Sequence, residues 1–257
     1  MSDVLNLSKS EVSFIQGLRK RDKRMATGLT IVEGYPETKR AYVAKVPFEK
    51  LYICPEIFVP VGDEFKGIEI INITKESFAA IAFGERLKGI LALCKPEQPT
   101  LTDLKLKEKP FIMMLEGVEK PGNLGAVLRT SDGAGVDAVI MCNGKTDIFN
   151  HNVVRSSIGT VFTVPVVSAT NEEALSFLNE HNINIYAATA HTDELYTDCD
   201  LEEACAVIVG TEHDGLSDFW VKNAKTCIKI PMEGAATCLN VAMSASIIAY
   251  EGHRQRN

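Results

Sequence analysis

Six continuously apolar runs in the C-terminal half alternate with segments of helical spacing, and this alternation limits the folds that the chain can adopt. The runs read FIMMLEGV, DAVIMCN, TVPVV, INIYAATA, CAVIVG and TCIKIP. Strands that are apolar on both faces suit a parallel sheet covered by helices on each side. The sequence therefore predicts an α/β domain with a mostly parallel sheet in this half.

The N-terminal part predicts a smaller α/β module. A helix is expected over Lys9–Lys20, followed by strands at TIVEG, KLYICP, IEIINI and GILALCK and by helices at PETKRAYVA and KESFAAIA. The segment Lys95–Pro110 is rich in Pro and charge and lacks apolar periodicity. We therefore expect domains at residues 1–98 and 111–257, joined by a linker at 99–110.

Charge and composition exclude several classes of protein. The formal charge of −7 argues against indiscriminate nucleic-acid binding, although residues 1–50 hold ten Lys or Arg against six Asp or Glu. The basic run Arg19–Arg24 is either a solvated helix face or an RNA contact. Seven cysteines without CxxC spacing and five scattered histidines predict neither a disulfide framework nor a metal site. No apolar stretch reaches membrane-spanning length, and we expect a cytosolic protein.

Three of the expected strands are followed by an unusual loop that leads into a helix. The segments that contain these loops are Glu116–Gly135, Gly210–Asp218 and Ile230–Glu251. Ligands of open α/β sheets bind at the carboxyl ends of strands, where these loops begin. In the third loop, the small residues 234–236 precede a helix whose first N–H groups and positive dipole end can meet a polar ligand.

Individual residues of the first loop allow two interpretations. Asn123 could cap the following helix, and Arg129 could pair with Glu116 or Glu119, which would give both residues a structural role. Alternatively, Gly125 allows close approach and Arg129 serves a ligand.

Residues of the other two loops also allow a structural and a functional interpretation when each loop is considered alone. Glu212 is either an exposed loop carboxylate or a group that orients Arg129. Gly210 allows a planar group to approach the backbone. Asn240 could be a helix-start residue and Cys238 a small buried hydrophobe.

The motifs NLGAVLRT, GTEHDGLSD and IPMEGAATCLNVAMSASI resemble, in order and spacing, those of the SpoU (TrmH) family of RNA ribose 2′-O-methyltransferases in the SPOUT superfamily. Upstream, IVEGYPETKRAY and GILALCKPE resemble the ribosomal-protein-like RNA-binding domain of many members. The resemblance implies a deep trefoil knot in the C-terminal domain, a substrate RNA-binding domain before it, and a homodimer formed partly by helix 240–251. It also implies S-adenosylmethionine bound mainly by backbone near Thr189, Gly210, Ile230, Met232 and Leu239.

The same resemblance implies that Arg129 is the catalytic arginine, supported by Asn123, Glu212 and Asn240. A guanidinium is a poor base, because its pKa lies above about 12. We therefore expect Arg129 to bind the RNA phosphate and orient the hydroxyl while an oxyanion relays the proton. Cys238 departs from the family pattern, which has serine there, and a thiol is a weaker hydrogen-bonding group.

Two other functions remain as alternatives. The first is a catalytically weak or inactive RNA-binding factor in ribosome assembly, which Cys238 supports. The second, a nucleotide-binding oxidoreductase or other small-molecule enzyme, is disfavoured because the sequence has neither GxGxxG nor a Ser/His/Asp elbow. The two-domain layout favours ribosomal RNA over transfer RNA as the substrate.

Overall fold

The computed structural model describes residues 4–211 and 215–257, and the chain divides into two compact units. Unit 1 comprises Met1–Glu97 and Phe149–Thr163, and unit 2 comprises Gln98–Ile148 and Val164–Asn257. Unit 1 is therefore built from two stretches of chain that are separated in the sequence.

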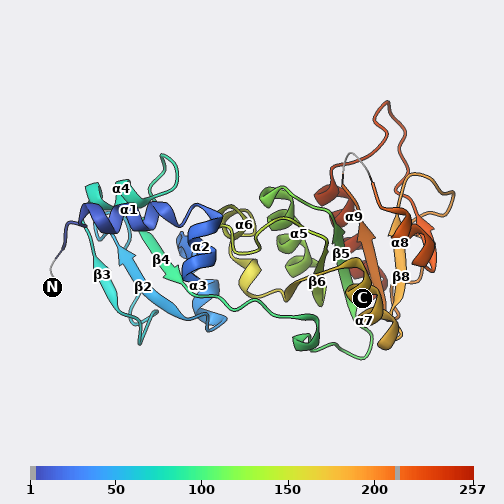
Figure 1. The fold of residues 1–257 in the computed structure, drawn as a ribbon, viewed down its shortest axis with the longest axis horizontal. Coiled ribbons are helices and arrows are strands. Elements are labelled where there is room, and N and C mark those ends of the chain that lie inside the picture. Colours follow the sequence, from blue (N-terminus) through green and yellow to red (C-terminus); the bar gives the residue numbers. More distant parts are fainter. Residues whose placement is uncertain (1–3, 212–214) are drawn as a thin grey trace. The chain divides into compact units, whose positions relative to one another are not determined.

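Unit 1 contains a mixed four-stranded sheet in the order β1-β4-β2-β3 (Figure 1). The strands are β1 (Thr30–Glu33), β2 (Phe48–Ile53), β3 (Ile70–Asn72) and β4 (Ile90–Cys94). Strand β4 is antiparallel to β1 and β2, and β2 is parallel to β3. All five residues of β4 are buried, as expected for an inner strand. The small α/β module predicted from the sequence is present.

Within the described residues, six helical segments belong to unit 1, and the first of them and the one that follows β3 bury apolar side chains against the sheet. They are α1 (Lys9–Gly17), α2 (Arg21–Thr27), α3 (Tyr35–Val43), α4 (Lys75–Ile81), α6 (His151–Ser156) and the 3-10 helix η2 (Thr160–Phe162). The shared core includes Ile15 and Leu18 from the first helical segment and Phe78 from α4, packed with Tyr52 and Leu91 of the sheet.

The expected helix Lys9–Lys20 is shorter than the sequence predicts. It ends at Gly17, and α2 starts at Arg21 inside the basic run. Arg24 is only 5% exposed, and its Nη1 donates hydrogen bonds of 2.8 Å to the carbonyls of Leu18 and Arg19. Carbonyls left without partners after a helix end are often met by basic side chains. Arg24 is thus structural, contrary to both interpretations of the basic run.

Residues 149–163 close one side of unit 1. The Thr30 hydroxyl donates to the Phe149 carbonyl at 2.6 Å, and Arg40 Nη1 donates to the Ile158 carbonyl at 2.8 Å. Gly159 has a φ of 81°, and a Cβ there would lie 2.8 Å from the Cα of Glu37. Only glycine combines this conformation with so close an approach to α3.

Unit 2 contains a six-stranded sheet in the order β10-β8-β9-β5-β6-β7. Its strands are β5 (Phe111–Glu116), β6 (Ala138–Cys142), β7 (Val166–Ala169), β8 (Asn184–Ala188), β9 (Cys205–Val209) and β10 (Thr226–Ile228). Each neighbouring pair is parallel. Strands β5, β6 and β9 are buried along their whole length, which confirms the parallel sheet predicted from the apolar runs.

Helices cover the sheet of unit 2. They are α5 (Pro121–Ala134), α7 (Asn171–Glu180), α8 (Asp218–Asn223) and α9 (Val241–Gln255), and a 3-10 helix η1 (Leu101–Asp103) precedes β5. Helices α5 and α9 pack on each other, with the Thr130 and Ser246 hydroxyls 2.9 Å apart. A Cβ on Gly252 would lie 2.5 Å from the Phe111 ring, so glycine lets α9 approach β5 closely.

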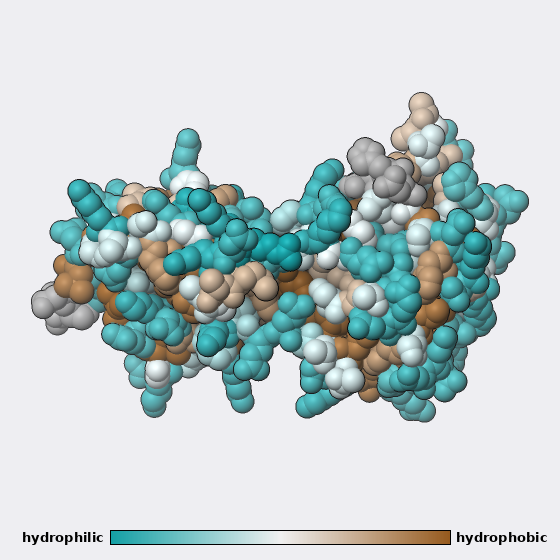
Figure 2. Space-filling view, in the orientation of Figure 1, coloured by the Kyte–Doolittle hydropathy of each residue, from teal (hydrophilic) through white to brown (hydrophobic). Residues whose placement is uncertain are grey.

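Hydrophilic residues cover most of the face seen in the space-filling view, and apolar patches lie between them (Figure 2). None of the helices in the described ranges combines the length and apolar character that crossing a bilayer requires.

Candidate active site

A cavity of about 360 Å³ lies in unit 2 at the carboxyl ends of β8, β9 and β10. The loop before α9 completes its wall. Five residues singled out from the sequence as cofactor contacts all line this one cavity: Thr189, Gly210, Ile230, Met232 and Leu239. Four of them follow three strand ends that are neighbours in the sheet but distant in the sequence, and Leu239 lies in the loop before α9. The location agrees with the rule that open parallel sheets bind ligands at their carboxyl edge.

Gly210 keeps the backbone compact at the end of β9. A Cβ at this position would overlap the backbone of Gly215 and Leu216. Gly215 has a φ of 65°, and its N–H donates to the Thr211 carbonyl at 3.1 Å. A side chain at 210 would therefore push this turn away and change the wall of the cavity.

The chemistry of the lining suits a flat and largely uncharged group. Small and apolar residues predominate, and the described lining residues include neither Asp, Glu, Lys nor Arg. Hydroxyls of Thr189 and Thr237 and the backbone at the strand ends supply polar contacts. These residues fit an adenosine moiety bound through backbone groups.

Asn240 and Asn123 meet beside this loop. Asn240 is the N-cap of α9, and its side chain accepts a hydrogen bond of 3.0 Å from the Ala242 N–H. Its Nδ2 donates to Oδ1 of Asn123 at 3.3 Å. The N-terminal turns of α5 and α9 therefore lie together, and the positive ends of both helix dipoles favour a negatively charged group nearby.

Asn123 does not cap α5, which corrects one interpretation of the sequence. Lys120 is the N-cap and Pro121 is the first helical residue. Proline suits that position because its φ is already helical and its missing N–H would have no intrahelical partner. Asn123 lies one turn further along.

Arg129 is exposed on α5, with no ion pair or hydrogen bond within the part of the chain that the structure describes. The interpretation that it pairs with Glu116 or Glu119 is wrong. Glu119 binds Lys145 at 2.7 Å, and Glu116 is buried in a different network. The guanidinium of Arg129 therefore forms an ion pair with neither carboxylate.

The network around Glu116 is one that sequence reasoning missed. Its Oε1 accepts from Asn171 Nδ2 at 2.8 Å and from the Ser217 hydroxyl at 2.7 Å, and its Oε2 accepts from the Ser217 N–H at 2.8 Å. Trp220 Nε1 donates to Asn171 Oδ1 at 3.0 Å. This carboxylate connects the end of β5 to the starts of α7 and α8. The sequence signal that could have revealed this network is the position of Glu116, a charged residue at the end of an otherwise apolar run.

Cys238 and Glu212 are the remaining residues that the sequence predicts for the site. Cys238 lines the cavity beside Thr237 and Leu239 and is exposed, so it is not the buried hydrophobe that one interpretation expected. Glu212 lies outside the described residues. Among residues 4–211 and 215–257, no three His, Cys, Asp or Glu side chains are arranged to hold a metal ion.

The fold and site together define an α/β domain that binds a small ligand at the carboxyl edge of its parallel sheet. The family model described as SpoU rRNA Methylase matches residues 110–250, and the model described as MRM3-like substrate binding domain matches residues 9–92. The chain therefore belongs to the SpoU rRNA methylase family.

Similar proteins extend along nearly the whole chain. The 23S rRNA (guanosine(2553)-2′-O)-methyltransferase RlmP of Bacillus subtilis is 27% identical over 251 residues, which cover 97% of this chain and 98% of that protein. The crystal structure of an RNA 2′-O ribose methyltransferase, 30% identical, has a TM-score of 0.86 and covers 98% of both chains. An AdoMet-bound rRNA methyltransferase from Sinorhizobium meliloti, 24% identical, shares the fold with a TM-score of 0.88 over 98% of this chain and 97% of its own.

Proposed function

We propose that this chain transfers a methyl group from S-adenosylmethionine to the 2′-hydroxyl of a ribose in ribosomal RNA. The observation that carries the proposal is the cavity in which Thr189, Gly210, Ile230, Met232 and Leu239 gather in a member of the SpoU rRNA methylase family. When bound, the cofactor supplies an electrophilic methyl group on a sulfonium.

The cofactor would be held by this chain mostly through backbone groups at the three strand ends. The uncharged lining suits its adenosine part, and the side-chain-free surface of Gly210 keeps the wall in place. Excluding water from such a cavity strengthens every polar contact made inside it.

Arg129 would bind an RNA phosphate and orient the ribose hydroxyl, and an oxyanion would take up the proton that the hydroxyl loses. Its exposed guanidinium presents two parallel N–H donors to a phosphate, a geometry that lysine lacks. Asn123 and Asn240 would hold the substrate beside the two helix N-termini, and Glu212 would orient Arg129. Placement of the hydroxyl in line with the methyl group supplies much of the rate.

Ribosomal RNA is the substrate that the relatives favour. RlmP, which matches nearly the full length of this chain, is named as a 23S rRNA guanosine 2′-O-methyltransferase. Transfer RNA is the competing substrate.

The same proposal assigns a role to each part of the chain. We assign residues 1–98 to substrate RNA binding, 99–110 to the linker and 111–257 to methyl transfer, except that residues 149–163 pack in unit 1 and go with the RNA-binding part. A trefoil knot around the cavity and a cytosolic location belong to this proposal. A homodimer would use α9, on which Met243 and Tyr250 are 51% and 52% exposed.

The competing function is an RNA-binding factor that does not methylate, and Cys238 is the residue that favours it. Calorimetry with S-adenosylmethionine separates the two, because the enzyme requires cofactor binding. Cys238→Ser tests the thiol directly: we expect a gain in methyl transfer of about two- to tenfold, the worth of one hydrogen bond. An active wild-type protein whose rate is unchanged by Cys238→Ser would show that the hydroxyl has no role here.

The decisive test is transfer of labelled methyl groups to ribosomal RNA from cells that lack the gene. The enzyme is expected to restore a 2′-O-methyl mark that is absent from this RNA and present in RNA from the parent cells. Transfer to transfer RNA alone would change the substrate, and the absence of any lost mark would favour the binding factor.

A further inference from the structure

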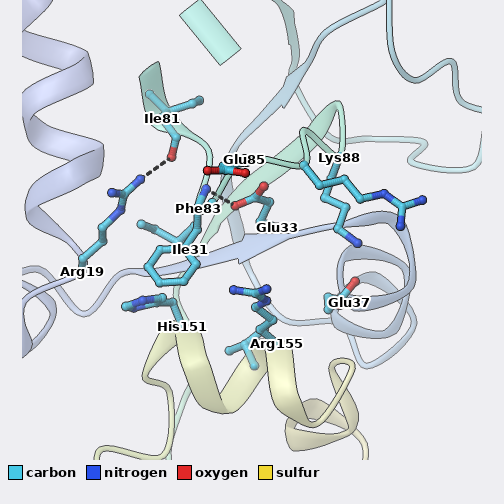
Figure 3. A pocket seen from close by; sticks show the side chains of 13 residues that line it. Arg19, Ile31, Glu33, Glu37, Ile81, Phe83, Glu85, Lys88, His151 and Arg155 are labelled. Carbon is cyan, nitrogen blue, oxygen red and sulfur yellow. Dashed lines mark hydrogen bonds between the residues drawn. The ribbon is translucent and has the colours of Figure 1, made fainter. Parts of the chain in front are cut away.

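A second cavity, of about 280 Å³, lies entirely within unit 1 (Figure 3). Strand β1 contributes Ile31 and Glu33, the segment after α4 contributes Phe83, and α6 contributes His151 and Arg155. Typical small-molecule sites enclose about 300–1,000 Å³, so this cavity suits a group the size of one nucleobase.

Several polar atoms of the residues that line this cavity are buried without a hydrogen-bond partner among the described residues. They are Glu33 Oε1, Arg19 Nε and both ring nitrogens of His151. Buried polar atoms are costly unless water or a ligand meets them. Four such atoms from three side chains around one cavity mark a place where a ligand with both donors and acceptors would gain hydrogen bonds.

Two of the three side chains that carry these atoms, Glu33 and Arg19, are held in position by their other polar groups. Glu33 Oε2 accepts from the Phe83 N–H at 2.7 Å, as the dashed line in Figure 3 shows. Arg19 Nη2 donates to the carbonyls of Ile81 and Ala82 at 3.0 and 2.7 Å. Their remaining polar atoms are therefore presented by a rigid frame, which lowers the entropy cost of binding.

Aromatic and guanidinium groups form one wall. The ring of Phe83 lies 4.6 Å from that of His151, and the guanidinium carbons of Arg19 and Arg155 each lie 5.4 Å from the Phe83 ring centre. Unpaired RNA bases stack on aromatic rings and guanidinium planes. This wall has the composition of such a stacking surface.

Both signs of charge surround the opening. Arg86, Lys88 and Arg155 are exposed cations on the lining, whereas Glu33, Glu37 and Glu85 are carboxylates. A simple anion would meet these carboxylates unfavourably. A nucleotide suits the mixture, because its base offers N–H donors to a carboxylate and its phosphate attracts the outer cations.

We propose that this cavity binds one unpaired guanine base of the substrate RNA, with Glu33 accepting from the base edge and Arg155 contributing to the stacking wall. Guanine has two adjacent donors, N1–H and N2–H: one would meet the unpartnered Glu33 Oε1, and the other the second lone pair of Oε2, which already accepts from the Phe83 N–H. Its O6 and N7 acceptors match Arg19 Nε–H and the N–H of neutral His151. Adenine and cytosine offer a single amino group, and uracil a single N–H. The inference rests on the proposed function in one respect, that the substrate is RNA.

Burial agrees with this assignment. It raises the pKa of the Glu33 carboxyl, because the charged form loses water, and it lowers the pKa of His151 to about 4 with further effects of Arg24, Arg19 and Arg155. A neutral His151 has one donor and one acceptor nitrogen. A base that donates to Glu33 would replace the hydration that burial removes.

The test measures binding of guanosine, adenosine, cytidine and uridine 5′-monophosphates to the full chain by calorimetry, together with single-stranded RNA hexamers that contain one or no guanosine. We expect the guanosine compounds to bind about tenfold or more tightly than the others, the worth of one good base-edge contact. Glu33→Gln should lose this preference, and the matched replacement Glu49→Gln, at an exposed residue of β2, should keep it.

A second variant, at an exposed position, keeps the proposal testable if Glu33→Gln does not fold. Arg155 is exposed, so Arg155→Gln can be made without disturbing the core. This variant should bind the guanosine-containing hexamer about threefold or more weakly than the wild type does. Equal binding of all four nucleotides, or unchanged binding in Glu33→Gln and Arg155→Gln, overturns the proposal. Binding of the mononucleotide without competition by the hexamer also overturns it, because the ligand would then be a free nucleotide.

Failure of this inference and failure of the proposed function give different results. S-adenosylmethionine binding and methyl transfer are measured on the same preparations. Methyl transfer without guanine preference rejects the cavity alone, and guanine preference that depends on Glu33 without methyl transfer rejects the enzyme alone.

Discussion

The side chain of Asn240 donates a hydrogen bond of 3.3 Å to the side chain of Asn123, although the two residues are 117 positions apart. Asn240 simultaneously caps α9 by accepting from the Ala242 N–H. One amide therefore fixes both the start of α9 and its distance from the start of α5. Both residues belong to the proposed active site, so this contact links local helix formation to placement of the substrate.

Asn240→Ser separates the two roles of Asn240. Serine also caps helices, so we expect the free energy of unfolding to change by less than about 1 kcal/mol. Methyl transfer should fall about tenfold or more because the contact to Asn123 is lost. Chemical denaturation and single-turnover kinetics measure the two effects. The matched exchange Thr170→Ser at the N-cap of α7 should change neither. Equal rates for Asn240→Ser and wild type would contradict the role of the contact.

Arg129→Ala should reduce methyl transfer about 10²- to 10³-fold, the usual cost of removing one donor that stabilises a transition state. Arg129→Lys should recover little, because an ammonium lacks the parallel donors of a guanidinium. Cofactor affinity, measured by calorimetry, should stay at the wild-type value in both. Lys222→Ala, which removes an exposed cation on α8, is the control. Full activity in Arg129→Lys would show that charge alone suffices.

Gly210→Ala should abolish cofactor binding at concentrations that saturate the wild type. The new Cβ would overlap the backbone of Gly215 and Leu216, and the wall of the cavity would have to move. Gly122→Ala on α5 is the matched control, since a Cβ there meets no atom within 4 Å. Helix propensity predicts that Gly122→Ala stabilises the protein by up to about 1 kcal/mol. Calorimetry and thermal unfolding distinguish the two variants.

Glu116→Ala should lower the free energy of unfolding by about 2–4 kcal/mol, because the buried donors of Asn171 and Ser217 would lose their acceptor. Glu119→Ala removes a carboxylate only three residues away and should leave stability close to that of wild type. Its ion pair with Lys145 is exposed, with side chains 60% and 79% accessible. Similar unfolding curves for the two variants would contradict the importance of the buried network.

Acid should destabilise unit 1 through His151. Its pKa falls from 6.5 to about 4 on folding, so the unfolded chain binds the proton more tightly and stability is lost as the pH drops from about 6.5 to about 4. Partial exposure limits the effect to about 1–3 kcal/mol. The raised pKa values of Glu33 and Glu37 act in the opposite direction, since those carboxyls bind protons more readily when folded.

Comparison with His151→Gln isolates the histidine from these carboxyls. Hydrogen exchange of unit 1 amides at pH 7 and pH 4.5 should show a smaller acid effect in the variant than in the wild type. The same replacement at exposed His253 is the control. An identical acid effect in wild type and His151→Gln would assign the loss of stability to other groups.

Local patterns were sufficient to predict most of the secondary structure. The apolar runs became the six parallel strands of unit 2, because a run that is apolar on both faces can be satisfied only inside a covered sheet. Two of the segments that follow these strands contain Gly210, Ile230, Met232 and Leu239, which line one cavity, whereas Thr189 was named only through the family resemblance.

Contacts between distant segments could not be predicted in this way. The hydrogen bond from Asn240 to Asn123, the buried role of Arg24 and the union of residues 149–163 with unit 1 all depend on chain segments meeting in space. Nothing in the local sequence of 149–163 distinguishes its surroundings, since its apolar residues would suit either unit. The cavity beside Phe83 was missed for the same reason.

The second stretch of unit 1 has a practical consequence for dissecting this chain. A fragment that starts after Glu97 would carry residues 149–163 without the strand and helix that they cover, and a fragment that stops there would leave Thr30, Glu37 and Arg40 without their partners. A single proteolytic cut in the linker should therefore yield two pieces that stay associated under native conditions. Severing the polypeptide once does not separate its halves.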